Sequence, residues 1–318
     1  MIKLSNLVAS YTTARGQVNA VDGVNLQIPS EYIVGIAGES GCGKTTLIRV
    51  IYGDMSPPLS LEKGEVRYGF CDANGTEVTS DNIGDYWSKR ISYIPQSSMS
   101  SLNPVTRIRK QFTDFLDYDK GRAELLDEVR AYVKNLDLPP EAIDAYPHEL
   151  SGGMRQRILV AMATFFQPDI LLADEPTTAL DVVVQKGILL MLKRLQEQMQ
   201  NTIILVSHDM GVHYQIAQKM LIMYAAKVVE FGDTREVFEA PLHPYTRFMI
   251  ESLPTIGDDR VRQSVRGRPP SLWEDLKGCR FAPRCPMATE RCRSEEPALR
   301  EYRPGQFVAC HYVERSLQ

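Results

Sequence analysis

The chain has 318 residues, of which 43% are apolar and 24% are charged, the composition of a globular protein with room for a large and a small domain. Its formal net charge is −4, so no overall basic field points to nucleic acid as a partner. No apolar run approaches the roughly 20 residues that a membrane helix needs, and the first residues lack the apolar core of a signal peptide. We therefore expect a soluble, cytosolic chain.

The first segment predicts strands that lead into a phosphate-binding loop. IKLSNLVASY alternates polar and apolar residues, and EYIVGIAGES is a buried strand that runs into glycines. GESGCGKTT then fits G-x-x-x-x-G-K-[ST], and TTLIRVIY follows with helical spacing. Backbone N–H groups and a helix N-terminus bind phosphate in such a loop, while the lysine reaches the β- and γ-phosphates and the hydroxyl binds Mg²⁺. The predicted nucleotide-binding residues are Gly38, Glu39, Ser40, Gly41, Cys42, Gly43, Lys44, Thr45 and Thr46.

A helical pattern runs from about Ser101 to Tyr146, and LSGGMRQR follows it. Ser151, Gly152 and Gly153 predict a helix N-cap with two bare amides, which is a second anion-binding helix end in the same chain. One nucleotide does not need both ends from one subunit. Two subunits that face each other head to tail would use both, one from each subunit.

Two buried apolar runs, DILLADEP and NTIILVSHD, flank a predicted helix, so the order strand–helix–strand indicates a parallel sheet with right-handed crossovers. Asp174 and Glu175 end the first run, His208 ends the second, and Gln96 closes a shorter strand. Strand ends at one edge of an α/β sheet are where ligands bind. We expect Asp174 and Gln96 to serve Mg²⁺, Glu175 to act as general base toward water, and His208 to sense the γ-phosphate.

After LIMYAAKVVEFGD, a predicted terminal hairpin, the chain becomes richer in proline and arginine, which places a domain boundary near Ala240. Four of the six cysteines lie in this tail with the spacing C-x₅-C-x₆-C-x₁₇-C. A reducing cytosol disfavours disulfides, and structural zinc sites usually contain tight C-x₂₋₄-C pairs. Four thiolates at longer spacing suit a [4Fe–4S] cluster, although zinc and packed free thiols stay open as alternatives. The candidate ligands are Cys279, Cys285, Cys292 and Cys310.

Together these motifs resemble the ATP-binding subunits of ABC transporters over about residues 2–240. GESGCGKTT resembles their Walker A loop, Gln96 the Q-loop, LSGGMRQR the signature motif and ILLADE Walker B, while Asp181 falls in the D-loop and His208 is the switch histidine. Tyr11 lies where the family stacks an aromatic ring on adenine. The resemblance implies an α/β fold: a P-loop cassette at residues 1–240 with a RecA-like core, an antiparallel β-subdomain and a helical subdomain at about 97–165. It also implies ATP and Mg²⁺ as ligands, with Ser151, Gly152, Gly153 and Asp181 acting on the nucleotide of the opposite subunit.

A narrower resemblance joins QSSMSSLNPVTRI, PTTALDVVVQ and PLHPYT to oligopeptide and dipeptide importers, whose relatives take up nickel or oligosaccharides. It implies an ATPase that drives import and a small cysteine-rich C-terminal domain at residues 241–318 that holds an iron–sulfur cluster. The implied partners are a second ATPase subunit, often a different chain, two transmembrane permeases and an extracytoplasmic solute-binding protein, with no nucleic acid. The implied location is the cytoplasmic face of the cell membrane. A soluble ABC ATPase of the repair or translation type is the alternative of a different class.

Overall fold

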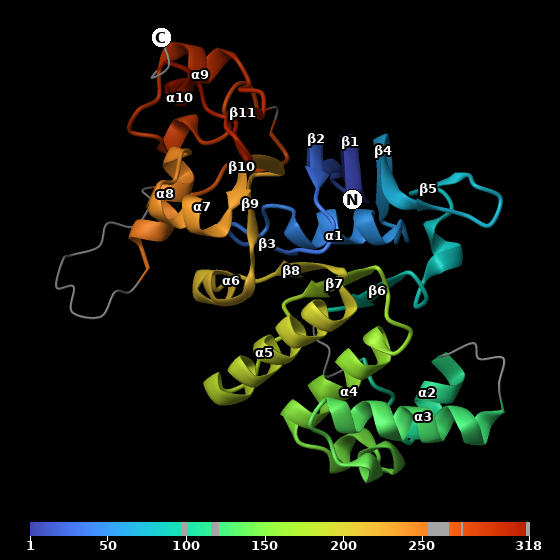
Figure 1. Ribbon diagram of the computed structural model, residues 1–318. Helices are drawn as coiled ribbons and strands as arrows, with labels where there is room; N and C mark the ends of the chain where they lie inside the picture. Colours follow the sequence, from blue (N-terminus) through green and yellow to red (C-terminus); the bar gives the residue numbers. More distant parts are fainter. Residues whose placement is uncertain (97–100, 116–120, 254–266, 275, 316–318) are drawn as a thin grey trace.

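The computed structural model describes the chain except for residues 97–100, 116–120, 254–266, 275 and 316–318 (Figure 1). Within the described residues the strands form two sheets, a larger one in the order β11-β12-β10-β9-β3-β8-β7-β6 and a smaller one in the order β2-β1-β4-β5. The larger sheet forms the centre of the molecule, and it positions the loops on which the predicted site depends.

The central part of the larger sheet is parallel, as the sequence predicts. β6 (Ile91–Ile94), β7 (Ile170–Asp174), β8 (Thr202–Val206), β3 (Ile33–Ala37) and β9 (Lys219–Tyr224) pair in parallel. α5 (Val182–Met199) connects β7 to β8. The residues of β3 alternate between two cores, because Ile33 and Ala37 pack on one side and Val34 and Ile36 on the other. A sheet that is buried on both faces explains the continuous apolar runs of its strands.

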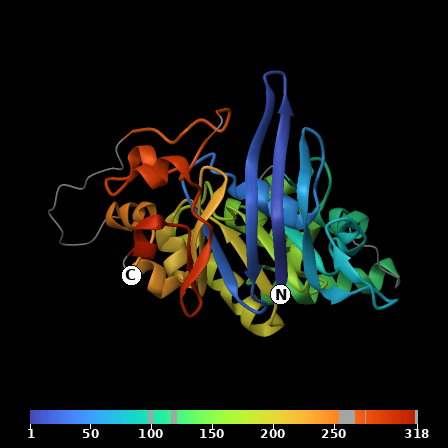
Figure 2. The ribbon, with the colours of Figure 1, turned by 90° about the horizontal axis from the view of Figure 1, so that it is seen from above.

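The smaller sheet is antiparallel and lies over one face of the larger one. It consists of β1 (Ile2–Thr13), β2 (Gly16–Ile28), β4 (Leu59–Cys71) and β5 (Glu77–Thr79). The hairpin of β1 and β2 extends beyond the body of the molecule in Figure 2. Its inward side chains share one apolar core with α1 (Lys44–Tyr52) and with the larger sheet, as shown by Leu4, Leu47 and Ile204.

A group of helices follows β6 and lies on the opposite side of the molecule from the C-terminal segment, the part of the chain after Ala240 (Figure 1). It contains α2 (Ile108–Phe115), α3 (Arg122–Asn135) and α4 (Gly152–Thr164), with short 3₁₀ turns at Pro140–Asp144 and Pro147–Glu149. Phe112, Val129 and Ile158 pack together in its core without exposure to solvent. No helix in the described part of the chain is both long and apolar enough to cross a membrane.

The C-terminal segment continues the larger sheet. β9 and β10 (Lys227–Asp233) form the predicted hairpin, but it is not terminal, because Glu230 of β10 pairs with Val308 of β12 (Gln306–Val308), which in turn pairs with β11 (Arg300–Arg303). α6 (Met210–Ile216) connects β8 to β9, and α7 (Thr234–Glu239) follows β10. The segment after Ala240 contains α8 (Pro244–Glu251), a 3₁₀ turn at Ala282–Arg284, α9 (Glu290–Ser294) and α10 (His311–Arg315). β11 and β12 of the tail therefore belong to the same sheet as the strands of the cassette. The predicted boundary near residue 240 stays a prediction.

Candidate functional site

The phosphate-binding loop lies between β3 and α1, as its sequence predicts. Gly38 and Gly43 have φ angles of +154° and +103°, a region that favours glycine. A Cβ on Gly38 would lie 2.2 Å from Met223 O, and one on Gly43 would lie 2.0 Å from Ala20 O. The loop is thus pressed against the backbone of β9 and β2, which only residues without a side chain allow.

Lys44 and Cys42 have different surroundings within this loop. Lys44 is 8% exposed, and its Nζ donates to Gly38 O at 2.8 Å and to Glu39 O at 3.0 Å, so the ammonium group lies inside the loop. Cys42 is buried, and this burial raises the pKa of its thiol even though Lys44 acts in the opposite direction. Lys44 is therefore placed to meet an anion, whereas Cys42 is a packed, protonated thiol.

A cavity of about 690 Å³ opens over the loop. Predicted residues from five segments line it: Tyr11, Ser40, Gly41, Gly43, Lys44, Thr45, Thr46, Gln96, Glu175 and His208. Tyr11 also has its hydroxyl 3.3 Å from Thr46 Oγ1, which ties β1 to the start of α1. Three further lining residues, Val18, Ala20 and Leu272, carry no motif that would reveal them in the sequence.

Three strand ends meet at Glu175 in this cavity. His208 Nδ1 is 3.4 Å from Glu175 Oε1, and Gln96 Nε2 is 3.4 Å from Glu175 Oε2. Thr178 donates to the same Oε2 at 2.9 Å, an interaction that the sequence analysis did not foresee. Glu175 has a φ of +49°, an uncommon value for a residue with a side chain, of the kind that structures retain at functional sites.

Asp174 is fully buried beside Glu175. The Tyr93 hydroxyl donates to Asp174 Oδ2 at 3.2 Å, whereas Oδ1 has no hydrogen-bond partner among the described residues. Burial raises the pKa of Asp174, while the nearby Thr45 and Tyr93 hydroxyls act in the opposite direction. A buried carboxylate oxygen without a partner, next to the threonine of the loop, is a donor set that suits a hard cation such as Mg²⁺.

The signature residues lie outside this cavity. Ser151 caps α4 by accepting from Met154 N at 3.2 Å, and Asp181 caps α5 by accepting from Val183 N and Val184 N at 3.1 and 3.0 Å. The two helix starts touch, because a Cβ on Gly153 would lie 2.8 Å from Val184 Cγ1. Ser151, Gly152, Gly153 and Asp181 are absent from the residues that line the cavity of the same chain.

The four tail cysteines do not form a metal-ligand group in the described part of the chain. All are free thiols, and Cys279 N donates to Cys292 O at 2.8 Å. The pKa of Cys279 rises to about 11, mainly through burial, with contributions from the charges of Cys310, Cys292 and Cys285. Within the described residues, no group of three or more His, Cys, Asp or Glu side chains could hold a metal ion.

Comparison with known proteins agrees with this geometry. A family model described as "ABC transporter" matches residues 21–178, and a model described as "Oligopeptide/dipeptide transporter, C-terminal region" matches residues 229–292. A dipeptide transport ATP-binding protein of Caldanaerobacter subterraneus is 35% identical over 99% of this chain and 97% of its own length. An oligopeptide transport ATP-binding protein of Salmonella typhimurium is 36% identical over 98% of this chain and 93% of its own length.

A solved structure gives the same fold. The dimeric ATP-binding cassette in a post-hydrolysis state with ADP and Pi aligns with a TM-score of 0.62 at 26% identity, covering 74% of this chain and 99% of its own. The family resemblance that the motifs indicated is thereby confirmed. The chain belongs to the ATP-binding proteins of ABC transporters, in the group that carries the oligopeptide/dipeptide transporter C-terminal region.

Proposed function

We propose that this chain is the ATP-hydrolysing subunit of an importer and drives the uptake of oligopeptides or dipeptides through partner permeases. The observation that carries the proposal is the meeting of Glu175, His208 and Gln96 in the cavity above the phosphate-binding loop. The solute class rests on the names of the relatives and on the C-terminal region that they share with this chain. The solute itself is selected by the permeases and the binding protein, so oligosaccharide or nickel import remains the alternative.

The residues around the cavity support the following proposed roles toward the nucleotide. The amides of the loop and Lys44 hold the phosphates, and Tyr11 stacks on the base. Glu175 takes a proton from the attacking water, and His208 donates a hydrogen bond to the γ-phosphate. Gln96 lies on the other oxygen of Glu175, where it orients the same water.

Thr45, Gln96 and Asp174 are the proposed Mg²⁺ residues. The fit rests on the buried Oδ1 of Asp174, which has no partner among the described residues, close to Thr45. A bound Mg²⁺ would neutralise charge on the β- and γ-phosphates. The Tyr93 hydroxyl donates to the other oxygen, Oδ2, and thereby fixes the orientation of the Asp174 carboxylate.

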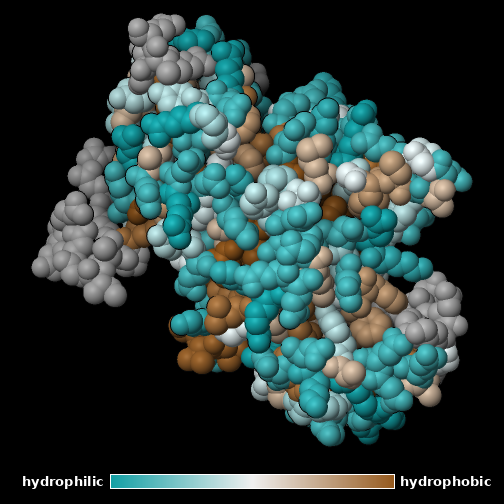
Figure 3. All heavy atoms as spheres, in the orientation of Figure 1, coloured by the Kyte–Doolittle hydropathy of each residue, from teal (hydrophilic) through white to brown (hydrophobic). Residues whose placement is uncertain are grey.

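A second ATPase subunit, of the same or a different sequence, completes the site in this proposal. Ser151, Gly152, Gly153 and Asp181 lie outside their own cavity, and the similar solved cassette is dimeric. Val182 and Val183, next to Asp181, are 79% and 81% exposed. Figure 3 shows apolar surface over α5 as a brown area, which a partner subunit would cover.

Two permeases and an extracytoplasmic solute-binding protein are the other proposed partners, with the chain on the cytoplasmic face of the membrane. In this arrangement the helices around α2 and α3 contact the permeases. A repair or translation ATPase would instead follow DNA or ribosomes on fractionation. We expect the chain to co-purify with membranes only when the permeases are present. Co-purification with DNA or ribosomes instead of membranes would favour the alternative.

We also propose that residues 241–318 form a small domain in which Cys279, Cys285, Cys292 and Cys310 hold a [4Fe–4S] cluster. The support is that all four are free thiols and that burial raises the pKa values of Cys279, Cys285 and Cys310. Thiolates are the ligands of such clusters, so a bound cluster would displace the protons of its cysteine ligands. Anaerobically purified protein should contain about four irons per chain. One zinc per chain, or no metal, would refute the cluster.

The Glu175→Gln variant tests the hydrolytic assignment. It should retain ATP and lose turnover, because glutamine keeps the shape of the side chain but accepts no proton from water. Asp209→Asn is the matched control: it neutralises a nearby carboxylate that caps α6 and does not line the cavity, and asparagine also caps helices. Normal hydrolysis by Glu175→Gln would refute the role of Glu175 as general base.

A further inference from the structure

The C-terminal segment contacts the phosphate-binding loop directly at Glu39. Arg284 Nη1 donates to Glu39 Oε2 at 2.8 Å, and Nη2 donates to Oε1 at 3.0 Å. The Arg284 side chain is 6% exposed and that of Glu39 is 29% exposed. Burial alone would lower the pKa of Arg284, but its hydrogen bonds to Glu39 and Tyr224 raise it instead. A bidentate pair with a buried guanidinium is among the strong arrangements of an arginine and a carboxylate.

The backbone of Glu39 is held from the same side. Glu39 N donates to the hydroxyl of Tyr245 at 2.8 Å, and Tyr245 is fully buried at the start of α8. The ring of Tyr245 packs against Tyr224 and Phe281, with centroids 4.6 and 5.5 Å away. Because these rings are buried and interlocked, the hydroxyl has a fixed position.

Glu39 in turn affects the lysine of the loop, since its carbonyl oxygen accepts from Lys44 Nζ at 3.0 Å. Three groups of Glu39 are therefore bound: the carboxylate by Arg284, the amide by Tyr245 and the carbonyl by Lys44. Leu272, also from the C-terminal segment, lines the nucleotide cavity. The segment thus contacts Glu39 of the loop through two residues, Arg284 and Tyr245, and lines the nucleotide cavity through a third, Leu272.

We propose that Arg284 and Tyr245 are positioning residues for the nucleotide site, which hold Glu39 so that the loop amides and Lys44 face the phosphates. The proposal rests on the assignment of this loop as the ATP site. It has a second, electrostatic consequence: Arg284 neutralises the Glu39 carboxylate, which would otherwise repel the phosphates. The cassette therefore depends on the C-terminal segment for tight nucleotide binding.

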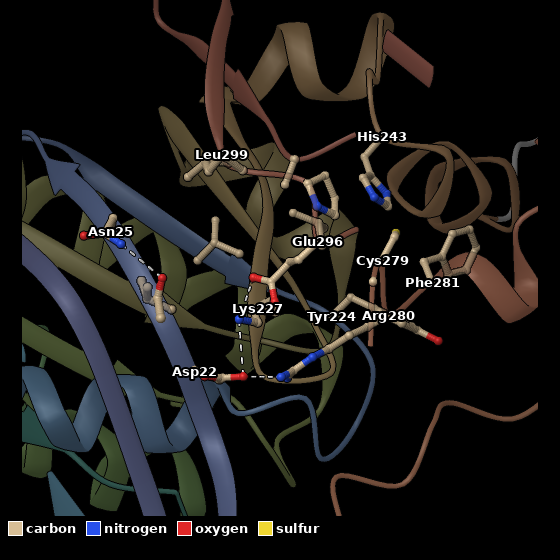
Figure 4. Close-up of a pocket in the computed structure, with 18 residues that line it drawn as sticks. Asp22, Asn25, Tyr224, Lys227, His243, Cys279, Arg280, Phe281, Glu296 and Leu299 are labelled. Carbon is tan, nitrogen blue, oxygen red and sulfur yellow. Dashed lines mark hydrogen bonds and ion pairs between the residues drawn. The ribbon is translucent and has the colours of Figure 1, made fainter. Parts of the chain in front are cut away.

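A neighbouring ion pair supplies a matched control. Arg280 bonds Asp22 of β2 and the carbonyl of Ala225, and Lys227 lies 3.3 Å from the same Asp22, beside a cavity of about 270 Å³ between the C-terminal segment and the cassette (Figure 4). The Arg280 pair also fastens the segment to the cassette. It does so without a contact to Glu39. Its removal therefore shows how much ATP binding depends on attachment of the segment in general, apart from the positioning of Glu39.

The test measures the dissociation constant of a fluorescent ATP analogue, with Mg²⁺, for the full chain. Arg284→Gln should weaken binding about tenfold, equivalent to about 1.4 kcal/mol, while Arg280→Gln stays within about twofold of the original chain. Combining Glu39→Gln with Arg284→Gln should cost no more than Arg284→Gln alone, because both changes remove the same interaction. Should Arg284→Gln fail to fold, Tyr245→Phe tests the positioning of Glu39 through its backbone, because it removes only the hydroxyl that accepts from Glu39 N. This variant should also weaken binding.

Three results would overturn the inference: unchanged affinity in Arg284→Gln or Tyr245→Phe, an equal loss in Arg280→Gln, or a larger loss in the double variant than in Arg284→Gln alone. Lys44→Ala distinguishes a wrong assignment of the ATP site from a wrong positioning role of Arg284. If it does not weaken binding, the assignment of the ATP site is wrong; if it abolishes binding while Arg284→Gln has no effect, only the positioning role is wrong.

Discussion

Lowering the pH should destabilise the chain through a buried histidine at the start of α8. His243 is 1% exposed, and its Nδ1 accepts from Tyr245 N at 3.0 Å, which caps the helix. Burial lowers the pKa of His243 from its ordinary value of 6.5 to about 3. Since the folded-state pKa is lowered, the unfolded state binds the proton first. The stability is therefore complete above about pH 6.5 and is lost as the pH falls toward 3.

The magnitude follows from the pKa difference. Between the two pKa values, each fall of one pH unit lowers the free energy of unfolding by about 1.4 kcal/mol. At about pH 5, keeping His243 neutral therefore lowers it by about 2 kcal/mol. His213, fully buried with its pKa lowered to about 4 by burial, adds a loss of similar size. Protonation of His243 would also remove the acceptor for Tyr245 N, which ties the loss to α8.

Urea unfolding of the chain and of His243→Asn at about pH 7 and about pH 5 measures this effect. Asparagine caps a helix without titrating, so the variant should lose about 2 kcal/mol less than the original chain between the two pH values. His213 is present in both proteins and cancels in the comparison. An equal loss in both proteins would show that His243 is not held neutral, and the reasoning from its burial would be wrong.

Two further substitutions test the loop and the facing subunit. Gly43→Ala should destabilise the chain by about 3 kcal/mol and weaken ATP binding, because its Cβ would lie 2.0 Å from Ala20 O at a φ of +103°. Gly41→Ala is the control, with no atom within 4 Å of its Cβ, and should destabilise the chain by about 1 kcal/mol. Equal losses of stability in thermal unfolding of the two variants would contradict the close approach at Gly43. Ser151→Arg should abolish ATPase activity in the assembled transporter, because it fills the start of α4, whereas Ser151→Thr keeps a capping hydroxyl and most of the activity; an active Ser151→Arg assembly would refute the action of Ser151 on the opposite nucleotide.

The sequence alone determined the local chemistry of this protein. Glycines before Lys44 predict a loop that binds phosphate, and the structure places them between β3 and α1 under steric pressure that only glycine tolerates. The apolar runs that end in Asp174 and His208 predict parallel strands, and these strands are β7 and β8 of the larger sheet. Such predictions succeed because they rest on backbone geometry and periodicity within a few residues.

The tertiary structure decided what depends on contacts between distant segments. Nothing in the sequence reveals that Tyr93 and Thr178 hold Asp174 and Glu175, and Leu272 reaches the cavity only through the path of the C-terminal segment. The sequence predicts a terminal hairpin at LIMYAAKVVEFGD, yet β12 pairs with β10 and extends the sheet beyond that hairpin.

Arg284 and Glu39 show the reason most clearly. They are 245 residues apart in the sequence and form a bidentate pair. In the sequence, Glu39 occupies a variable position of the loop, and Arg284 is one of several arginines among the cysteines. Neither residue type nor spacing predicts such a pair, because its formation depends on how β9, β10 and the segment after Ala240 pack against the loop.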